Sequence, residues 1–263
     1  MRTIKLVIEY DGTAYCGWQR QSASAEENAP SVQGMLEAAI RDIAGEPANI
    51  IGAGRTDAGV HALGQVAKFA TTSRIPEDRF PAALNGHLPP DIRVLEALDV
   101  PETFHPRYDA VARTYRYDTL NRPAPSALDR LRAYHIPDPL DLGALDEALA
   151  PFAGRHDFAA YQAAGSRPRT TVCTVREAAW VRDGDRLSLT ITADRFLRHM
   201  VRILVGTMVR VGTGRLPPGA PAEFLADPDG RRTGPTAPAH GLYLLRVEYP
   251  DFLVGTGGVI QGS

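Results

Sequence analysis

The most chemically suggestive segment is a glycine-rich loop, GAGRTDAGVHALG, at residues 52–64. Glycine permits backbone angles closed to other residues and lets a ligand approach the chain closely. Arg55 and Asp57 stand two residues apart in this loop, and a nearby positive charge favours the ionised form of a carboxyl group. An ionised carboxylate can serve as a nucleophile or as a base. The same features also fit a structural β-turn with a solvated aspartate, so the residues alone leave both interpretations open.

Other kinds of chemistry find little support in the sequence. The loop matches neither GxxxxGK[ST] nor GxGxxG, so we expect no nucleotide cofactor. The two cysteines, Cys16 and Cys173, and the seven histidines show no metal-ligand spacing, so we expect no metal site and no cofactor. No nucleophile elbow supports Ser/His/Asp catalysis. His199 shares a helix face with Arg202, where it could approach a bound molecule or simply be packed or solvated.

Composition describes an ordinary soluble protein of one or two domains. The 263 residues are 44% apolar and 23% charged. The most apolar stretch, residues 196–211, contains three arginines and cannot span a bilayer. The first twelve residues do not resemble a signal peptide, and two distant cysteines do not suggest disulfides. We therefore expect a cytoplasmic protein without membrane association.

Arginines cluster locally although the net charge is −2. The clusters are Arg167 with Arg169, Arg195 with Arg198 and Arg202, and Arg231 with Arg232. A global charge says little about a local surface, and arginine pairs well with phosphate oxygens. Solvated surface charge remains the simpler interpretation of the clusters alone.

Periodicity in the sequence predicts a mixture of strands and helices. We expect strands at residues 3–10, 50–51, 65–71, 92–98, 114–121, 170–182, 186–193 and 241–249. We expect helices at residues 32–43, 77–88, 142–152, 197–211 and 221–226. This order indicates an α+β class. We divide the chain into an N-terminal α+β domain at 1–105 that carries the Asp57 loop, a C-terminal α+β domain at 106–250, and a flexible tail at 251–263.

The string GRTDAGVHA at residues 54–62 resembles the signature of the TruA-type tRNA pseudouridine synthases. Further similar segments follow in the family's order and bring the resemblance to about residues 3–250. They are EYDGTAYCGWQRQ at 9–21, SVQG at 31–34, LNGHLPPDI at 84–92, FHPRYDAVARTYRY at 104–117, FLRHMVRILVGTMVRVG at 196–212 and AHGLYLLRVEYP at 239–250. One departure is the segment between Arg20 and Ser31, which is longer than the usual family spacing and acidic.

The resemblance implies roles for five residues. Asp57 occupies the position of the catalytic aspartate, and Arg55 is similar to a residue that helps displace the target base. Tyr115 corresponds to a tyrosine that packs on the uracil ring and takes part in proton transfer. Arg202 resembles the arginine that pairs with the catalytic carboxylate, and Leu244 an apolar wall of the pocket. Without the resemblance, Tyr115 would be read as a half-buried packing residue and Arg202 as a helix surface charge.

The resemblance also implies a fold and a reaction. The fold has two similar ferredoxin- or RRM-like halves, with a mostly antiparallel sheet running across both and a central active-site cleft. The reaction converts uridine to pseudouridine at family positions 38, 39 and 40 in the anticodon stem-loop of tRNA, by a homodimer without a cofactor. The target base must first leave its stack, which costs a few kcal/mol. Asp57 could then add to the base, attack the sugar or remove a sugar proton.

Two other functions fit the sequence less well. One is a non-catalytic module that binds tRNA and helps it fold, which would not need Asp57, Tyr115 and Arg202 together. The other is a pseudouridine synthase that acts on another RNA, which the close match of GRTDAGVHA disfavours.

Overall fold

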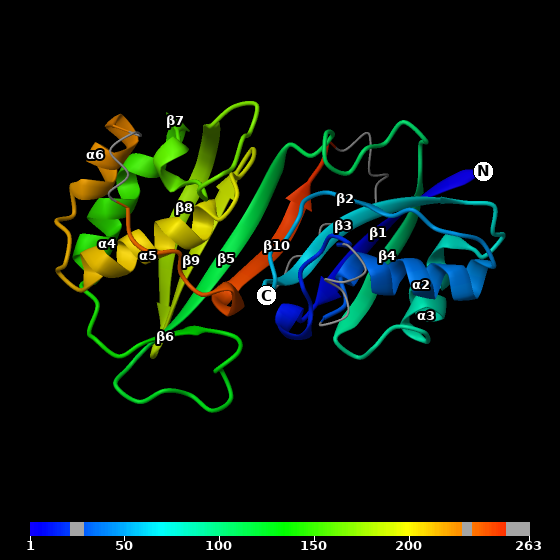
Figure 1. The fold of residues 1–263 in the computed structure, drawn as a ribbon, viewed down its shortest axis with the longest axis horizontal. Coiled ribbons are helices and arrows are strands. Elements are labelled where there is room, and N and C mark those ends of the chain that lie inside the picture. Colours follow the sequence, from blue (N-terminus) through cyan, green and yellow to red (C-terminus); the bar gives the residue numbers. More distant parts are fainter. Residues whose placement is uncertain (22–28, 228–232, 251–263) are drawn as a thin grey trace. The chain divides into compact units, whose positions relative to one another are not determined.

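The computed structural model describes residues 1–21, 29–227 and 233–250 of the chain. These residues form ten strands and five α-helices, and most strand pairings are antiparallel (Figure 1). The α+β class predicted from the sequence is therefore confirmed. The acidic segment at 22–28, the Arg231–Arg232 pair and the expected flexible tail lie outside the described residues.

The chain divides into two compact units. The first contains the described residues of Met1–Ala112 and residues 246–250, and the second contains the described residues of Arg113–Leu245. The division falls inside the last strand, β10 (Leu242–Glu248), through which the chain returns to the first unit. The domain limits expected at residues 1–105 and 106–250 remain predictions.

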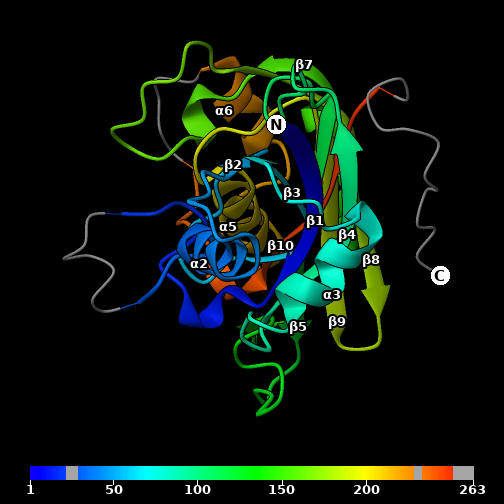
Figure 2. The ribbon, with the colours of Figure 1, turned by 90° about the vertical axis from the view of Figure 1, so that its right-hand side faces the viewer.

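Strand β1 (Arg2–Tyr10) is the central strand of the first unit. It pairs antiparallel with β3 (His61–Thr71) on one side and with β4 (Ile92–Val100) on the other, as Figure 2 shows. The short strand β2 (Ile51–Gly52) pairs antiparallel with β3. The Asp57 loop runs from β2 to β3, so both of its ends are held by the same strand pairing.

Helix α2 (Val32–Ala44) begins where the sequence predicts. The side chain of Ser31 accepts a hydrogen bond from the Gly34 N–H and caps the helix. The helix ends at Gly45, whose φ of 71° is the left-handed angle of a C-terminal glycine. Fully buried side chains from β1 and α2 contribute to the core of this unit: Ile4, Leu6, Ile8, Leu36 and Ile40.

Helix α3 (Phe80–Asn85) is shorter than the helix predicted at residues 77–88. A 3-10 turn, η2 (Glu77–Arg79), precedes it. The side chain of Asn85 then donates to the Val94 carbonyl at 2.9 Å and accepts from the Val94 N–H at 2.8 Å. This pair of hydrogen bonds ties the end of α3 to β4 and ends the helix early.

Four antiparallel neighbours form the sheet of the second unit. They follow the order β5 (Ala112–Asn121), β9 (Arg186–Ala193), β8 (Val172–Asp183) and β7 (Gly154–Asp157). Strand β6 (Tyr134–Ile136) pairs parallel with β5. The sequence missed β6 and β7, which are too short to show an alternating pattern.

Helices α4 (Leu142–Leu149), α5 (Met200–Gly212) and α6 (Ala220–Ala226) gather beside β8 and β9 (Figure 1). Helix α4 stops before the predicted residue 152 and continues as a 3-10 turn that contains Pro151, which lacks a backbone N–H. Helix α5 begins at Met200 rather than at Leu197, because His199 has a φ of 62° and cannot belong to a right-handed helix. The 3-10 turns within the described residues are η1 (Gly12–Ala14), η2 (Glu77–Arg79), η3 (Ala150–Phe152), η4 (Ala159–Tyr161) and η6 (Ala239–Gly241).

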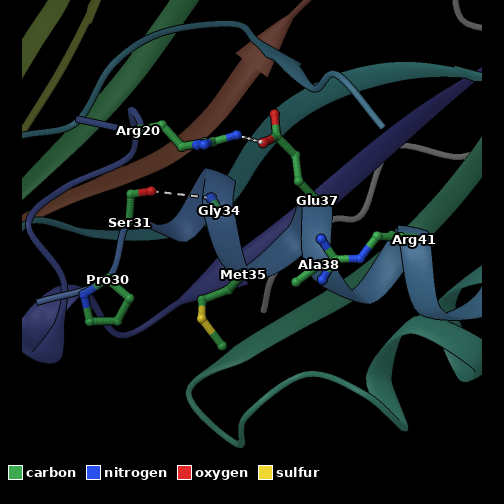
Figure 3. A pocket seen from close by; sticks show the side chains of 8 residues that line it. All are labelled: Arg20, Pro30, Ser31, Gly34, Met35, Glu37, Ala38 and Arg41. Atoms are coloured by element: carbon green, nitrogen blue, oxygen red, sulfur yellow. Dashed lines mark hydrogen bonds and ion pairs between the residues drawn. The ribbon is translucent and has the colours of Figure 1, made fainter. Parts of the chain in front are cut away.

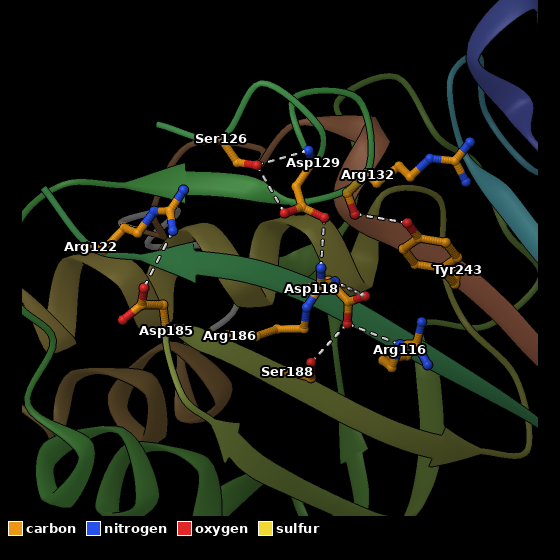
Figure 4. A network of polar contacts seen from close by, with 10 residues as sticks. All are labelled: Arg116, Asp118, Arg122, Ser126, Asp129, Arg132, Asp185, Arg186, Ser188 and Tyr243. Carbon is orange, nitrogen blue, oxygen red and sulfur yellow. Dashed lines mark hydrogen bonds and ion pairs between the residues drawn. The ribbon is translucent and has the colours of Figure 1, made fainter. Parts of the chain in front are cut away.

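A buried carboxylate holds part of the second unit together (Figure 4). Asp118 on β5 accepts hydrogen bonds from Ser188 Oγ at 2.8 Å and from Arg186 Nη1 at 3.0 Å. Arg186 Nη2 also donates to Asp129 at 2.8 Å, in the segment that follows β5. A buried charge is tolerated when it is paired and hydrogen-bonded, and removing one partner is costly. The network therefore fastens the segment between β5 and β6 to β9.

Helix α5 is packed against the backbone of residues 234–237. A Cβ atom at Gly206 would lie 1.7 Å from the Pro235 carbonyl oxygen, and one at Gly234 would lie 2.4 Å from the Gly206 oxygen. The Gly234 N–H also donates to Thr207 Oγ1 at 2.9 Å. The close approach of helix α5 to residues 234–237 thus requires glycine at both Gly206 and Gly234.

This contact makes Gly206 a sensitive position for stability. We expect Gly206→Ala to lower the free energy of unfolding by about 1–3 kcal/mol, because the added methyl group overlaps a carbonyl that has little room to move. Denaturation by urea, followed by circular dichroism, measures this change. The control is Gly86→Ala, whose Cβ would have its nearest neighbour at 3.5 Å. Equal stability of the two variants would contradict the prediction.

Candidate active site

Asp57 lies at the turn of the loop between β2 and β3. It forms an isolated antiparallel bridge with Gly17, and the Val60 N–H donates to the Asp57 carbonyl at 3.2 Å. Gly59 within this turn has a φ of 77°, which glycine adopts without steric cost. Asp57 is half-buried. The β-turn expected from the glycines is present, and Asp57 is its first residue, before Ala58 and Gly59.

The residue before Asp57 anchors the loop. Thr56 is buried, and its Oγ1 is 2.7 Å from the hydroxyl of the buried Tyr10 on β1. The Thr56 carbonyl accepts a hydrogen bond from the Trp18 N–H at 3.1 Å. Earlier in the loop, the carbonyl of Gly54 accepts from Gln65 Nε2 at 3.0 Å. Side chain and backbone together therefore fix the position from which Asp57 projects.

Two glycines outside the loop let a second segment lie directly against it. Gly17 has a φ of 109°, and a Cβ there would lie 2.6 Å from the Thr56 carbonyl oxygen. A Cβ at Gly12 would lie 2.0 Å from the Val60 carbonyl oxygen. No other residue type allows both contacts, because real Cβ atoms do not come so close to backbone. The segment around EYDGTAYCGW thus serves to support the loop.

Arg55 is exposed and is held through helix α2. Its Nε donates to Gln19 Oε1 at 3.2 Å, and Gln19 Nε2 donates to Gln33 Oε1 at 2.7 Å. Gln33 is buried and in turn donates to Glu37 at 2.9 Å. This chain of hydrogen bonds directs the Arg55 side chain while leaving it at the surface.

Tyr115 on β5 is half-buried in the second unit. Its ring meets that of Phe196 edge to face, with centroids 4.9 Å apart and planes at 81°. This geometry is a favourable one for aromatic pairs. The contact holds the Tyr115 ring in one orientation, as a stacking platform for a base requires.

Arg202 on α5 is half-buried and joined to the segment that precedes β10. Its Nε donates to the Ala237 carbonyl at 2.8 Å, and the Ala237 N–H donates to the Arg202 carbonyl at 3.0 Å. The next carbonyl, that of Pro238, accepts from the Tyr117 hydroxyl at 2.7 Å. Burial raises the pKa of Tyr117, although the positive charge of Arg202 acts in the other direction. The hydroxyl therefore stays protonated and able to donate.

Leu244 on β10 is buried, with 1% of its surface exposed. Its neighbour Tyr243 lies under the Arg116 guanidinium at 4.9 Å and donates to the Arg132 carbonyl at 2.8 Å (Figure 4). Burial raises the pKa of Tyr243 to about 12, so this hydroxyl also stays protonated. Arg116 is further paired with Asp118, since Arg116 Nε lies 2.9 Å from a carboxylate oxygen, although its N–H is not aligned as a hydrogen bond. The strand that carries Leu244 is thus firmly placed.

The predicted site residues fall in both units. Arg55 and Asp57 belong to the first unit, and Tyr115, Arg202 and Leu244 belong to the second. The supporting residues Thr56, Tyr10 and Tyr117 were missed by sequence reasoning. The sequence offered one signal for Tyr10 and Tyr117, because the hydroxyl of a buried tyrosine usually forms a hydrogen bond.

No alternative reactive centre is evident in the part of the chain that the structure describes. No group of three or more His, Cys, Asp or Glu side chains there could hold a metal ion. Cys16 and Cys173 are not joined in a disulfide, and burial raises the pKa of Cys173 to about 12, which leaves it unreactive. Among the same residues, no helix is long and apolar enough to cross a membrane.

Comparison with known proteins identifies the family. A sequence profile described as tRNA pseudouridine synthase matches residues 6–109 and 148–250. The chain is 46% identical to tRNA pseudouridine synthase A of Acetivibrio thermocellus over 249 residues, which are 95% of this chain and 100% of the relative. It is 45% identical to tRNA pseudouridine synthase A of Moorella thermoacetica over the same shares. The chain belongs to the tRNA pseudouridine synthase family.

Membership in the tRNA pseudouridine synthase family establishes the reaction. The enzyme is an isomerase that converts uridine in tRNA to pseudouridine, and both the predicted family and the predicted activity are confirmed. The matched residues include the Asp57 loop and helix α5. In a pseudouridine synthase, the bond from ribose to nitrogen-1 of uracil breaks and a bond to carbon-5 forms, so a detached base must be held in place.

The Tyr10–Thr56 hydrogen bond should matter for both stability and turnover. We expect Tyr10→Phe to lower the free energy of unfolding by about 1–3 kcal/mol, because the buried Thr56 hydroxyl loses its partner. We also expect kcat to fall about tenfold or more at nearly constant KM, because Asp57 follows Thr56 directly and small displacements are costly. Denaturation and steady-state kinetics with tRNA measure the two effects.

The matched control is Tyr249→Phe. Tyr249 lies in the same unit, and its hydroxyl donates to the Pro106 carbonyl at 2.7 Å rather than to a residue of the Asp57 loop. This variant should lose stability without losing kcat. A Tyr10→Phe enzyme with normal kcat would show that the loop does not depend on this bond.

Proposed function

We propose that Asp57 is the catalytic carboxylate of this pseudouridine synthase and that its targets are uridines at positions 38, 39 and 40 of the tRNA anticodon stem-loop. One observation carries the assignment of Asp57. It projects from a turn whose preceding residue is fixed by Tyr10 and Trp18, within the motif GRTDAGVHA. A carboxylate held so firmly can meet a reacting atom in a repeatable geometry.

The proposed chemistry needs only side chains of this chain. No atoms are added to the base overall, because the proton lost from carbon-5 is balanced by one gained at nitrogen-1. Asp57 acts in its ionised form, as nucleophile towards base or sugar or as base towards a sugar proton. Tyr115 stacks on the everted uracil, which is worth about 1–3 kcal/mol for a base on an aromatic ring. No metal, redox cofactor or nucleotide is needed for an isomerisation of this kind.

The remaining site residues act around Asp57. Arg202 would pair with the Asp57 carboxylate, orient it and favour its ionised form. Arg55 would help to displace the target base from its stack, which its exposed place on the loop allows. Leu244 would form an apolar wall of the uracil pocket. These roles come from the family resemblance, and the placement of each side chain within its own unit is compatible with them.

The assembly proposed for the enzyme also follows the family resemblance. It has two similar α+β halves, with a sheet running across both and a central cleft in which Asp57 meets Tyr115 and Arg202. Two copies of the chain form a homodimer that binds one tRNA in the cytoplasm. Recognition by shape and backbone contacts, rather than by reading bases, would suit several target positions.

Substitution of Asp57 tests its role directly. We expect Asp57→Asn to abolish tritium release from tRNA labelled at carbon-5 of uridine while leaving tRNA affinity unchanged, because the side chain keeps its size and loses its charge. The control is Asp78→Asn, at a side chain that is 72% exposed. Near-normal tritium release by the Asp57 variant would refute the assignment. Full cellular function of an inactive variant would instead favour a non-catalytic role in tRNA folding.

The target positions and the homodimer need separate tests. Pseudouridine mapping of RNA from cells that lack this gene should show losses at tRNA positions 38, 39 and 40 and nowhere else. Losses in another RNA would identify a different substrate. Sedimentation equilibrium should give twice the mass of the chain, and a monomer that is active at all concentrations would contradict the proposed dimer.

A further inference from the structure

A cavity of about 440 Å³ opens in the second unit beside the start of helix α5. Its volume falls within the range of about 300–1,000 Å³ that small ligands occupy, which is sufficient for one nucleotide. The lining residues come from three segments that meet there: Ala160, Gln162, Ala163, Ala164, Arg198, His199, Ile203, Thr233, Gly234, Pro235 and Thr236. None of the roles assigned above to Tyr115, Arg202 or Leu244 uses this cavity.

The charge of the cavity favours an anion. Arg198 is exposed and makes no ion pair or side-chain hydrogen bond within the described residues. His199 lies next to it, and among the described residues no carboxylate lines the cavity. The Ala163 N–H donates to the Arg198 carbonyl at 2.9 Å, which joins the segment that carries the exposed Arg167 and Arg169 to the same rim.

The walls of the cavity are firmly built. One wall is the segment 233–236, which the glycine contacts with α5 hold at backbone distance. The hydroxyls of Thr233 and Thr236 and the amide of Gln162 add neutral groups that can hydrogen-bond to a ribose or a phosphate. Ile203 and the alanines supply apolar surface. This mixture suits a sugar–phosphate unit better than a simple ion.

One segment that lines the cavity lies close in sequence to Phe196, the contact partner of Tyr115, to which the target base is assigned. Phe196 packs on Tyr115, and Arg198 and His199 follow it within three residues. A polynucleotide with one base on Tyr115 would therefore have its neighbouring backbone close to the same segment. The substrate is a polyanion, which matches the unpaired charge of Arg198.

A second cavity, of about 340 Å³, lies beside helix α2 in the first unit and lacks these features (Figure 3). Arg20 there is paired with Glu37 at 3.1 Å, so the cavity contains its own counter-charge. Ser31 uses its side chain to cap the helix, as the dashed line to Gly34 shows. The charge of this cavity is therefore largely satisfied from within the protein.

We propose that the cavity beside α5 binds one nucleotide of the tRNA next to the target uridine, with its phosphate on Arg198 and its ribose against Gln162 and the two threonines. This site would position the RNA strand and carry no sequence preference, because it contacts backbone rather than base edges. The proposal rests on the tRNA substrate and on the proposed stacking of the target base on Tyr115, and not on the role of Asp57. Since binding is measured without turnover, failure of one proposal leaves the other standing.

The test is the salt dependence of tRNA binding by Arg198→Gln. Each phosphate contact contributes about 0.7–0.9 to the slope of log K against log salt, so the slope should become shallower by that amount. The dissociation constant near 0.15 M salt should rise about 3- to 10-fold. Arg198→Lys keeps the charge and should retain most of the slope. An unchanged slope for Arg198→Gln would overturn the proposal.

Two further variants make the result specific. Arg182→Gln removes the same charge from an exposed arginine of the β8–β9 hairpin and should leave the slope unchanged. An equal loss in this control would show a general charge effect and would also overturn the proposal. Ala164→Glu places a carboxylate at an exposed position on the rim and should weaken tRNA binding most at low salt. Unaltered binding by that variant would count against the cavity as a tRNA contact.

Discussion

The Asp57 loop depends on one constraint, which is the close contact of its backbone with the segment that contains Gly12 and Gly17. Gly17 and Gly12 allow their chain segment to lie directly against the carbonyls of Thr56 and Val60. Any side chain at either glycine would separate the two segments and release the loop. The catalytic geometry proposed for Asp57 is thus set by residues that have no chemistry of their own. It also explains why EYDGTAYCGW and GRTDAGVHA occur together in one sequence.

In the second unit, glycines again allow close packing of backbone, and this packing places Arg202 and Tyr117. Gly206 and Gly234 bring α5 against the segment before β10, and Gly241 lies where a Cβ would be 2.7 Å from the Tyr117 ring. This segment supplies the carbonyls that receive Arg202 and Tyr117. The Nε of Arg202 is therefore held by a backbone carbonyl.

Regular elements were predictable from the sequence because their patterns are local. The strand at 3–10 and the helix capped by Ser31 appear as expected, within one residue at each end. Strands β6 and β7 could not be predicted, since three or four residues become a strand only through their partners. The start of α5 was placed too early, because nothing in the sequence marks the left-handed backbone of His199. Local periodicity therefore predicts that a helix or strand is present better than it predicts where that element begins and ends.

The site shows a similar limit of sequence reasoning. The motif resemblance supplied Asp57, Tyr115 and Arg202, but not the bond between Tyr10 and Thr56, which are 46 residues apart. That bond requires a particular register between β1 and β3, and alternation alone does not fix a register. Positioning residues of this kind can be recognised only once the strands are paired.

In the Asp57 loop, Thr56 anchors the backbone, and the neighbouring Asp57 is the residue proposed to carry out the chemistry. Thr56 is buried and uses its hydroxyl and its carbonyl for support, whereas Asp57 is half-buried. Had the carboxylate itself been the buried anchor, the groups that hold it would have competed with the substrate. Neutral hydrogen bonds at Thr56 avoid that conflict, because they hold the backbone without drawing on the charge of the next residue. A loop anchored at Thr56 is therefore compatible with the catalytic role proposed for Asp57.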